Sequence, residues 1–131
     1  PMINGAPFLD LPGFCETGLW LATAPGQHPH HIRYPELLEV LDVPCKRSGT
    51  LAIRDEYKGV VEAARDRMLE VGEWRLIRIA LNDAPAHALY HLPSDPNCTM
   101  NRADEKPDIV AALSDMMRDC TQLRVMTPVT A

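Results

Sequence analysis

Apolar and polar residues alternate most regularly between residues 67 and 96. From Trp74 to Leu81 they alternate with period two, with one slip of phase at Leu76-Ile77. This pattern predicts a strand with one face toward a core. Turn residues flank it at 71–72 and 82–85, and a second short strand is predicted at 88–92. Before these two strands, the spacing of apolar residues predicts a helix over 56–64, and a strand is predicted over 65–70. We therefore predict an antiparallel meander within residues 55–92.

A helix is predicted near the C-terminus, over residues 107–120. Pro107 suits the first helical position, and Asp108 complements the helix dipole. Apolar residues recur at spacings of three and four, at Ile109, Val110, Ala112, Leu113, Met116, Met117 and Cys120. Such a stripe predicts that the helix packs across the sheet. The expected fold class is therefore α+β, with about four antiparallel strands covered by one C-terminal amphipathic helix.

The N-terminal part predicts long irregular loops, in agreement with the 12 prolines of the chain. We predict an irregular arm over residues 1–14, a strand over 15–22 and a loop over 23–34. A short helix that begins at Pro35 is predicted over 35–42. A further loop is predicted over 42–50, and a brief strand over 51–53. The 131 residues together predict one domain, in which 15–54 are followed by the meander and the terminal helix.

Composition restricts the partners that we expect. The chain has 13 basic and 18 acidic residues and a net charge of −5, which disfavours nucleic acid and anionic membranes. No apolar run reaches the roughly 18–20 residues of a membrane span. No signal segment opens the sequence, which favours the cytoplasm. The chain starts at Pro1 without an initiator Met, which suggests a piece of a longer protein.

Three groups of side chains are candidates for chemistry. His28, His30 and His31 could hold a transition metal, but no carboxylate or thiol lies closer than Glu36. This favours a surface loop, with the rim of a pocket or substrate entrance as the alternative. The four cysteines, at 15, 45, 98 and 120, form no C-x-x-C pair and predict inert thiols. The acidic residues at 95, 104 and 105 lack the order of a calcium loop. We predict no catalytic, metal or cofactor site within the chain.

A set of short motifs resembles the C-terminal region of sulfatases in order and spacing, over most of residues 15–120. The residues that carry the resemblance are Glu16, Thr17, Gly18 and Trp20; Arg67, Gly72, Trp74 and Arg75; Tyr90, Asp95 and Pro96; the run Cys98-Thr99-Met100-Asn101-Arg102-Ala103; and Lys106-Pro107-Asp108-Ile109-Val110 with Leu113. They correspond to the family's E-T-G-l-W segment, its hairpin, its L-Y-D-L-x-x-D-P element, its T-x-N loop and the start of its terminal helix. The chain departs from these patterns at His91, which replaces an Asp, at Arg75, which replaces a Lys, and at Glu70 and Glu73, where basic residues are common.

The resemblance implies a small subdomain that packs against a large catalytic domain of the alkaline phosphatase superfamily. Calcium and a formylglycine, matured from a C-x-P-x-R or S-x-P-x-R motif, would belong to that catalytic domain. This chain contains no such motif, since the C-x-x-x-R runs at Cys98 and Cys120 lack the required proline.

We therefore expect the C-terminal part of a sulfatase-like hydrolase, in which the parent enzyme hydrolyses sulfuric esters and this part is non-catalytic by itself. The alternative is a stand-alone structural or interaction module derived from a sulfatase, and a small metal or thiol enzyme is a third reading. The expected partner is the catalytic domain or a second chain, a homo-oligomer included, bound through an exposed apolar sheet face. Trp74 and Leu76 are the candidates for that face, opposite the terminal helix.

Overall fold

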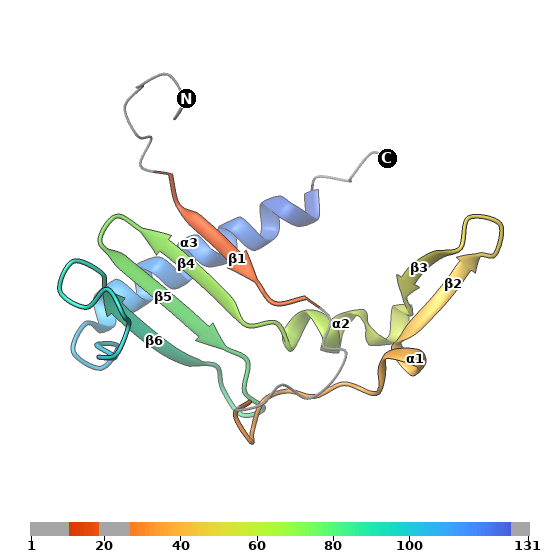
Figure 1. Cartoon of the computed structure of the whole chain (residues 1–131), viewed down its shortest axis with the longest axis horizontal. Helices are drawn as coiled ribbons and strands as arrows, with labels where there is room; N and C mark the ends of the chain where they lie inside the picture. The colour runs from red at the N-terminus through yellow and green to blue at the C-terminus, as the bar shows by residue number, and fades with distance from the viewer. Residues whose placement is uncertain (1–10, 19–26, 127–131) are drawn as a thin grey trace. The chain divides into compact units, whose positions relative to one another are not determined.

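The computed structural model describes residues 11–18 and 27–126 and has an α+β fold, as the sequence predicts (Figure 1). Its elements are β1 (Gly13–Glu16), α1 (Leu37–Val40), β2 (Leu41–Cys45), β3 (Thr50–Ile53), α2 (Asp55–Ala63), β4 (Arg67–Val71), β5 (Trp74–Ile79), β6 (Ala86–His91) and α3 (Pro107–Met126). One antiparallel sheet has four strands in the order β1-β4-β5-β6, and a second sheet pairs β2 with β3. The predicted meander and terminal helix are thus confirmed.

The described residues fall into two compact units. The first, which we call the sheet–helix unit, contains residues 11–15, 67–77 and 87–126. The second, the hairpin unit, contains residues 16–18, 27–66 and 78–86. The expectation of one domain over residues 1–131 stays a prediction.

The core of the sheet–helix unit lies between the sheet and α3. Leu69, Leu76 and Leu89 come from the middle of β4, β5 and β6, and none is exposed to solvent. Leu113 and Met117, one helical turn apart on α3, close the cluster. α3 accordingly runs across one face of the sheet (Figure 1). Full burial of each of these large apolar side chains contributes about 1.5–3 kcal/mol.

A two-residue turn joins β4 to β5 at Gly72-Glu73. Gly72 has a φ of +56°, a backbone conformation that residues with a Cβ rarely adopt and that tight hairpin turns require. The backbone N–H of Leu92, just after β6, donates to the carbonyl of Glu73 at 2.9 Å. The turn and the end of β6 are therefore held together at one end of the sheet.

The hairpin unit is built on a small separate core. Val40 at the end of α1, Val61 of α2 and Ala64 after it are each at most 3% exposed. β2 and β3 pair antiparallel, with Leu41 opposite Ile53 and Asp42 opposite Ala52. The predicted helix over 56–64 corresponds to α2.

Two sequence predictions in the hairpin unit are wrong. The helix predicted for 35–42 has only four residues, because the backbone at Leu41 is already extended, with φ −90° and ψ 149°. The loop predicted for 42–50 contains most of β2, whose pairing with β3 outweighs the turn signal of Pro44. A proline is tolerated there because the register of the pair shifts between Asp42 and Cys45.

Other boundaries differ less. α3 continues to Met126, past the predicted end at 120, and β1 begins at Gly13, within the predicted arm. Residues 1–10 of that arm and 19–22 of the predicted strand lie outside the described residues.

Two leucines offer a matched test of the core between the sheet and α3. Leu76→Ala removes a side chain with no exposed surface and leaves a cavity, so we expect the free energy of unfolding to fall by about 2–5 kcal/mol. Leu38→Ala, at a side chain that is 87% exposed, should change it by less than about 0.5 kcal/mol. Urea denaturation followed by circular dichroism measures both; equal losses would contradict the assigned core.

Candidate functional site

The candidate site is the face of the sheet that α3 leaves uncovered. Successive side chains of a strand point to opposite faces, and Leu69, Leu76 and Leu89 point to α3. Their neighbours along β4, β5 and β6 therefore form the other face, which we call the open face. It comprises Met68, Glu70, Arg75, Ile77, Ala88 and Tyr90, all of them part-exposed. Within the sheet–helix unit, no described element lies over it (Figure 1).

The prediction that Trp74 and Leu76 lie on this face is wrong. Leu76 is part of the core beneath α3, and Trp74 packs against the same core. The Trp74 ring also contacts the ring of His91 of β6, with centroids 4.8 Å apart and ring planes tilted by 52°. The alternation of β5 was read correctly, but α3 covers the opposite side from the one expected.

A charged group stands in the middle of the open face. Arg75 donates two hydrogen bonds to Glu70 Oε2, from Nε at 3.1 Å and from Nη2 at 2.7 Å. Its Nη1 donates to the Cys98 Sγ atom at 3.3 Å. The Glu70 carboxylate raises the pKa of Arg75 above its ordinary value, so the guanidinium stays charged. Glu70 and Arg75 form a cross-strand ion pair that neutralises itself.

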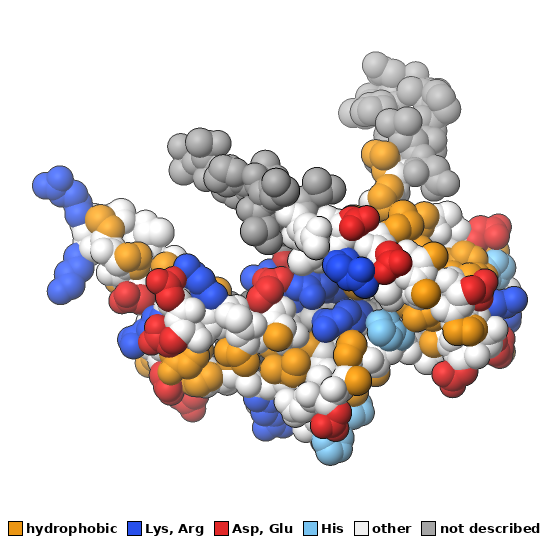
Figure 2. All heavy atoms as spheres, turned by 180° about the vertical axis from the view of Figure 1, so that it is seen from behind, with side chains coloured by type: hydrophobic (Ala, Val, Ile, Leu, Met, Phe, Trp, Pro, Cys, Tyr) orange, Lys and Arg blue, Asp and Glu red, His pale blue; other side chains and the backbone are white. Residues whose placement is uncertain are grey.

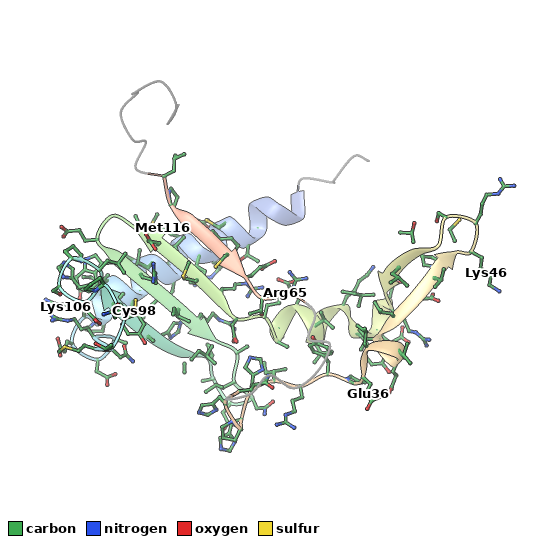
Figure 3. The ribbon with its side chains drawn as sticks, in the orientation of Figure 1. Glu36, Lys46, Arg65, Cys98, Lys106 and Met116 are labelled. Atoms are coloured by element: carbon green, nitrogen blue, oxygen red, sulfur yellow. The ribbon has the colours of Figure 1, made fainter. Side chains whose placement is uncertain are left out.

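Asp95 organises the loop that follows β6. Its side chain accepts hydrogen bonds from the backbone N–H groups of Thr99, at 2.8 Å to Oδ2, and of Met100, at 2.8 Å. The Thr99 hydroxyl donates to Oδ1 at 2.9 Å. The Met100 and Thr99 hydrogen bonds lower the pKa of this buried carboxyl, since they favour its charged form. The loop positions Cys98, which has a φ of +53°, beside the open face (Figure 3).

Asn101 ties the same loop back to the sheet. Its Oδ1 accepts the backbone N–H of Leu89 at 2.9 Å and that of Ala103 at 3.0 Å. The backbone N–H of Arg102 donates to the Leu89 carbonyl at 2.8 Å. The loop that contains Thr99, Met100 and Asn101 is therefore hydrogen-bonded to the outer edge of β6.

The three histidines of the 28–31 segment do not share one environment. His28 and His30 are exposed, as predicted for a surface loop, whereas His31 is only 1% exposed and contradicts that prediction. The reason is a pairing with a distant segment: Ile32 N–H donates to the Ala80 carbonyl at 2.9 Å, and Asn82 N–H donates to the His30 carbonyl at 3.0 Å. A role for these histidines at a pocket rim stays a prediction.

A short contact joins His31 to Asp66. The imidazole Nε2 lies 2.9 Å from Asp66 Oδ1, and Nδ1 lies 2.8 Å from the Ile32 carbonyl oxygen. Asp66 Oδ1 also accepts the backbone N–H of Ala80 at 2.8 Å. One carboxylate thus binds two separate segments of the hairpin unit.

The remaining motif residues have structural contacts or lie outside the described part. The Thr17 hydroxyl accepts the Asp66 N–H at 3.0 Å, and Glu16 forms an ion pair with Arg65. Gly18 is exposed, Arg67 and Tyr90 are part-exposed, and Pro96 is exposed next to Asp95. Trp20 lies outside the described residues. Sequence reasoning missed His31–Asp66 and Arg75–Glu70 as pairs, because neither partner signals the other in a short motif.

The chain matches no protein-family model and no curated protein. Among residues 11–18 and 27–126, no three His, Cys, Asp or Glu side chains gather as they would around a metal ion. No helix in that part of the chain is long and apolar enough to cross a membrane. The resemblance to sulfatases therefore rests on the motifs alone and stays a prediction.

Asp95 should make stability depend on pH. Because its pKa is lowered in the folded chain, its contribution is complete above the unfolded value of about 3.9 and is lost as pH falls through the folded pKa. Asp95→Asn lacks the charge at every pH, so its melting temperature should lie below that of the wild type at neutral pH and approach it in acid. A difference that is constant over the pH range would contradict the assigned role. Asp104→Asn, at an exposed residue, is the control.

Asp66 should tolerate an amide but not a truncation. Both Ala80 N–H and His31 Nε2 contact the same Asp66 oxygen, Oδ1, so in Asp66→Asn the amide Oδ1 can still accept from both. Asp66→Ala leaves these buried groups without their acceptor, at about 1–3 kcal/mol for each. We expect urea denaturation to show the larger loss for Asp66→Ala. The exposed Asp83→Ala is the control, and equal losses for both Asp66 variants would contradict the inferred network.

Proposed function

We propose that this chain is the C-terminal part of a sulfatase-like hydrolase and is non-catalytic by itself. In the parent enzyme, which hydrolyses sulfuric esters, the open face of the sheet packs against the catalytic domain. The observation that carries the proposal is this second, uncovered face of the sheet, which carries apolar side chains beside the Arg75–Glu70 ion pair. Calcium and formylglycine belong to the catalytic domain in this proposal, and none of their ligands is assigned to this chain.

The composition of the open face supports a covered role. An antiparallel sheet that packs on one side only usually presents polar side chains to water on the other. Here Met68, Ile77, Ala88 and Tyr90 alternate with core residues along three adjacent strands. Apolar side chains gathered on an uncovered sheet face favour an interaction site. A neighbouring domain would bury it without any change in the sheet.

The charges of the open face fit an interface between domains. Glu70 stands where the resembling family commonly has a basic residue, and it neutralises Arg75 through two hydrogen bonds. An ion pair that satisfies itself can be covered without leaving a single buried charge, which would be costly. Interfaces between domains are also more polar than obligate subunit interfaces. The departure from the family pattern is therefore compatible with burial.

The motif residues give independent support. Gly72 adopts the positive φ of the hairpin turn, Asp95 binds the N–H groups of its loop, and Asn101 joins the loop to β6. Pro107 begins α3. Each residue type meets a local physical requirement at the position where the resembling family places it. If this chain and the resembling family share one local structure, the motifs have to occur in this order. Short matches that arise by chance would have no reason to follow it.

The coding sequence upstream of Pro1 provides a direct test. We expect the reading frame to continue upstream and to encode a C-x-P-x-R or S-x-P-x-R motif. The intact polypeptide should hydrolyse an aryl sulfate, and residues 1–131 alone should not. A frame that opens near Met2 would replace the proposal with the stand-alone module, and turnover by residues 1–131 alone would contradict a non-catalytic role.

The open face can be tested within the intact polypeptide. Ile77→Glu places a charge on that face, so we expect a lower melting temperature and a loss of aryl sulfate hydrolysis in the intact protein. Because Ile77 is already part-exposed, residues 1–131 alone should lose less than about 1 kcal/mol of unfolding free energy. Met116→Glu, on an α3 side chain that is 38% exposed, is the control and should leave hydrolysis unchanged. Equal effects of the two variants on the intact protein would contradict the proposed docking face.

A further inference from the structure

One peptide bond of this chain differs chemically from the others. Asp95 precedes Pro96, and no other Asp-Pro pair occurs in the sequence. The amide nitrogen of Pro96 is tertiary, so it carries no proton and is more basic than an ordinary amide nitrogen. The Asp95 carboxylate belongs to the same residue as the carbonyl carbon of that bond and can reach it by closing a small ring. The Asp95–Pro96 bond therefore has a nucleophile and a good leaving group within the chain itself.

The reaction that this pair permits has two steps. One carboxylate oxygen of Asp95 attacks the carbonyl carbon of the same residue, and a C–O bond forms as the C–N bond to Pro96 breaks. The nitrogen of Pro96 takes a proton from acidic water and leaves as a secondary amine. Water then opens the cyclic anhydride of Asp95, which leaves a free C-terminus at residue 95 and a new N-terminus at residue 96. The net change is the addition of a water molecule, with acid as the catalyst.

The folded loop directs both carboxylate oxygens of Asp95 to donors on later residues. Oδ2 accepts the backbone N–H groups of Thr99 and Met100, each at 2.8 Å, and Oδ1 accepts the Thr99 hydroxyl at 2.9 Å. Before an oxygen can attack the carbonyl carbon of Asp95 itself, the carboxylate has to give up hydrogen bonds to these donors. Such hydrogen bonds are strong because their acceptor is charged. The folded loop therefore opposes the reaction.

The backbone of Asp95 is fixed as well, but in a way that does not protect the bond. Its N–H donates to the His91 carbonyl at 2.9 Å, and its carbonyl oxygen accepts the Cys98 N–H at 3.1 Å. A carbonyl that accepts a hydrogen bond is polarised toward attack. Asp95 is only 6% exposed, whereas Pro96 is exposed to the water that would supply the proton. The hydrogen bonds of the side chain are therefore what suppresses the reaction.

The charges around the loop keep this carboxylate in its nucleophilic form. Hydrogen bonds from Met100 and Thr99, together with the positive charge of Arg102, lower the pKa of Asp95 and so favour the carboxylate. Figure 2 shows acidic, basic and hydrophobic side chains together at this end of the sheet–helix unit, on the right of the view. The segment after the loop contains both signs, at Arg102, Asp104, Glu105 and Lys106. Protonation therefore does not silence Asp95 in the folded chain above its lowered pKa, and only the hydrogen bonds restrain it.

We propose that Asp95–Pro96 is a latent self-cleavage site, which the hydrogen bonds of its loop keep inactive in the folded chain. Opening of the loop frees the carboxylate, so the rate of cleavage follows the population of the open loop. The site lies between β6 and α3. After a cut, α3 would stay on the sheet only through the core contacts of Leu113 and Met117. This site goes beyond the proposed function and does not depend on it.

Removal of one hydrogen bond from the folded loop gives the first test. Thr99→Val keeps the shape of the side chain and its backbone N–H but lacks the hydroxyl that donates to Asp95. The chain is kept for days at the lowest pH at which circular dichroism still shows it folded, and mass spectrometry measures the fragments 1–95 and 96–131. We expect Thr99→Val to be cleaved at least about tenfold faster than the wild type. Thr121→Val makes the same change on α3 and should leave the rate unchanged.

The unfolded chain gives the reference rate. In guanidinium chloride at the same pH, the wild type and Thr99→Val should be cleaved at one common rate, faster than either is when folded, because no loop holds the carboxylate. Pro96→Ala should be cleaved more slowly in the denaturant, since its amide nitrogen is an ordinary one. A folded wild type that is cleaved as fast as the unfolded chain would overturn the proposal. So would a folded Thr99→Val that is cleaved no faster than the wild type, or an unfolded chain that is not cut between residues 95 and 96.

Discussion

One helix can cover only one face of a sheet, and the sheet–helix unit is arranged around that limit. Leu69, Leu76 and Leu89 form a row across three strands, and Leu113 and Met117 of α3 close over it. Because side chains alternate, fixing this row also fixes which residues face the other way. The positions that face away from α3 are thus set by the core row. Polar residues at these positions would have made the open face polar, but this sequence has apolar ones.

The polar side chains of this chain hold backbone together where no regular element does. Asp95 accepts from two consecutive N–H groups of its loop, and Asn101 accepts the Leu89 N–H at the edge of the sheet. In the hairpin unit Asp66 does the same for Ala80 while it pairs with His31. Buried backbone groups require partners, and these three side chains supply them where the strands end.

The sequence predicted what local periodicity determines. Alternation gave β5 and β6, and the apolar stripe gave α3, because both patterns are complete within a few turns or residues. It did not predict which face of β5 meets α3, since alternation defines two faces without ranking them. His31 was missed because its partner Asp66 lies 35 residues away, and no motif joins the two. β2 was missed because Pro44 reads locally as a turn, whereas its pairing with β3 depends on the register of both strands.

The open face and the β3 edge differ in what a partner would have to supply. The open face consists of side chains with fixed shapes, so a partner would have to offer a rigid surface that fits Met68, Ile77 and Tyr90. The β3 edge consists of backbone groups that any extended strand could satisfy, so shape gives it little specificity. A sheet face therefore discriminates between partners by the fit of side chains, whereas a strand edge does so by register, and the described residues include one surface of each kind.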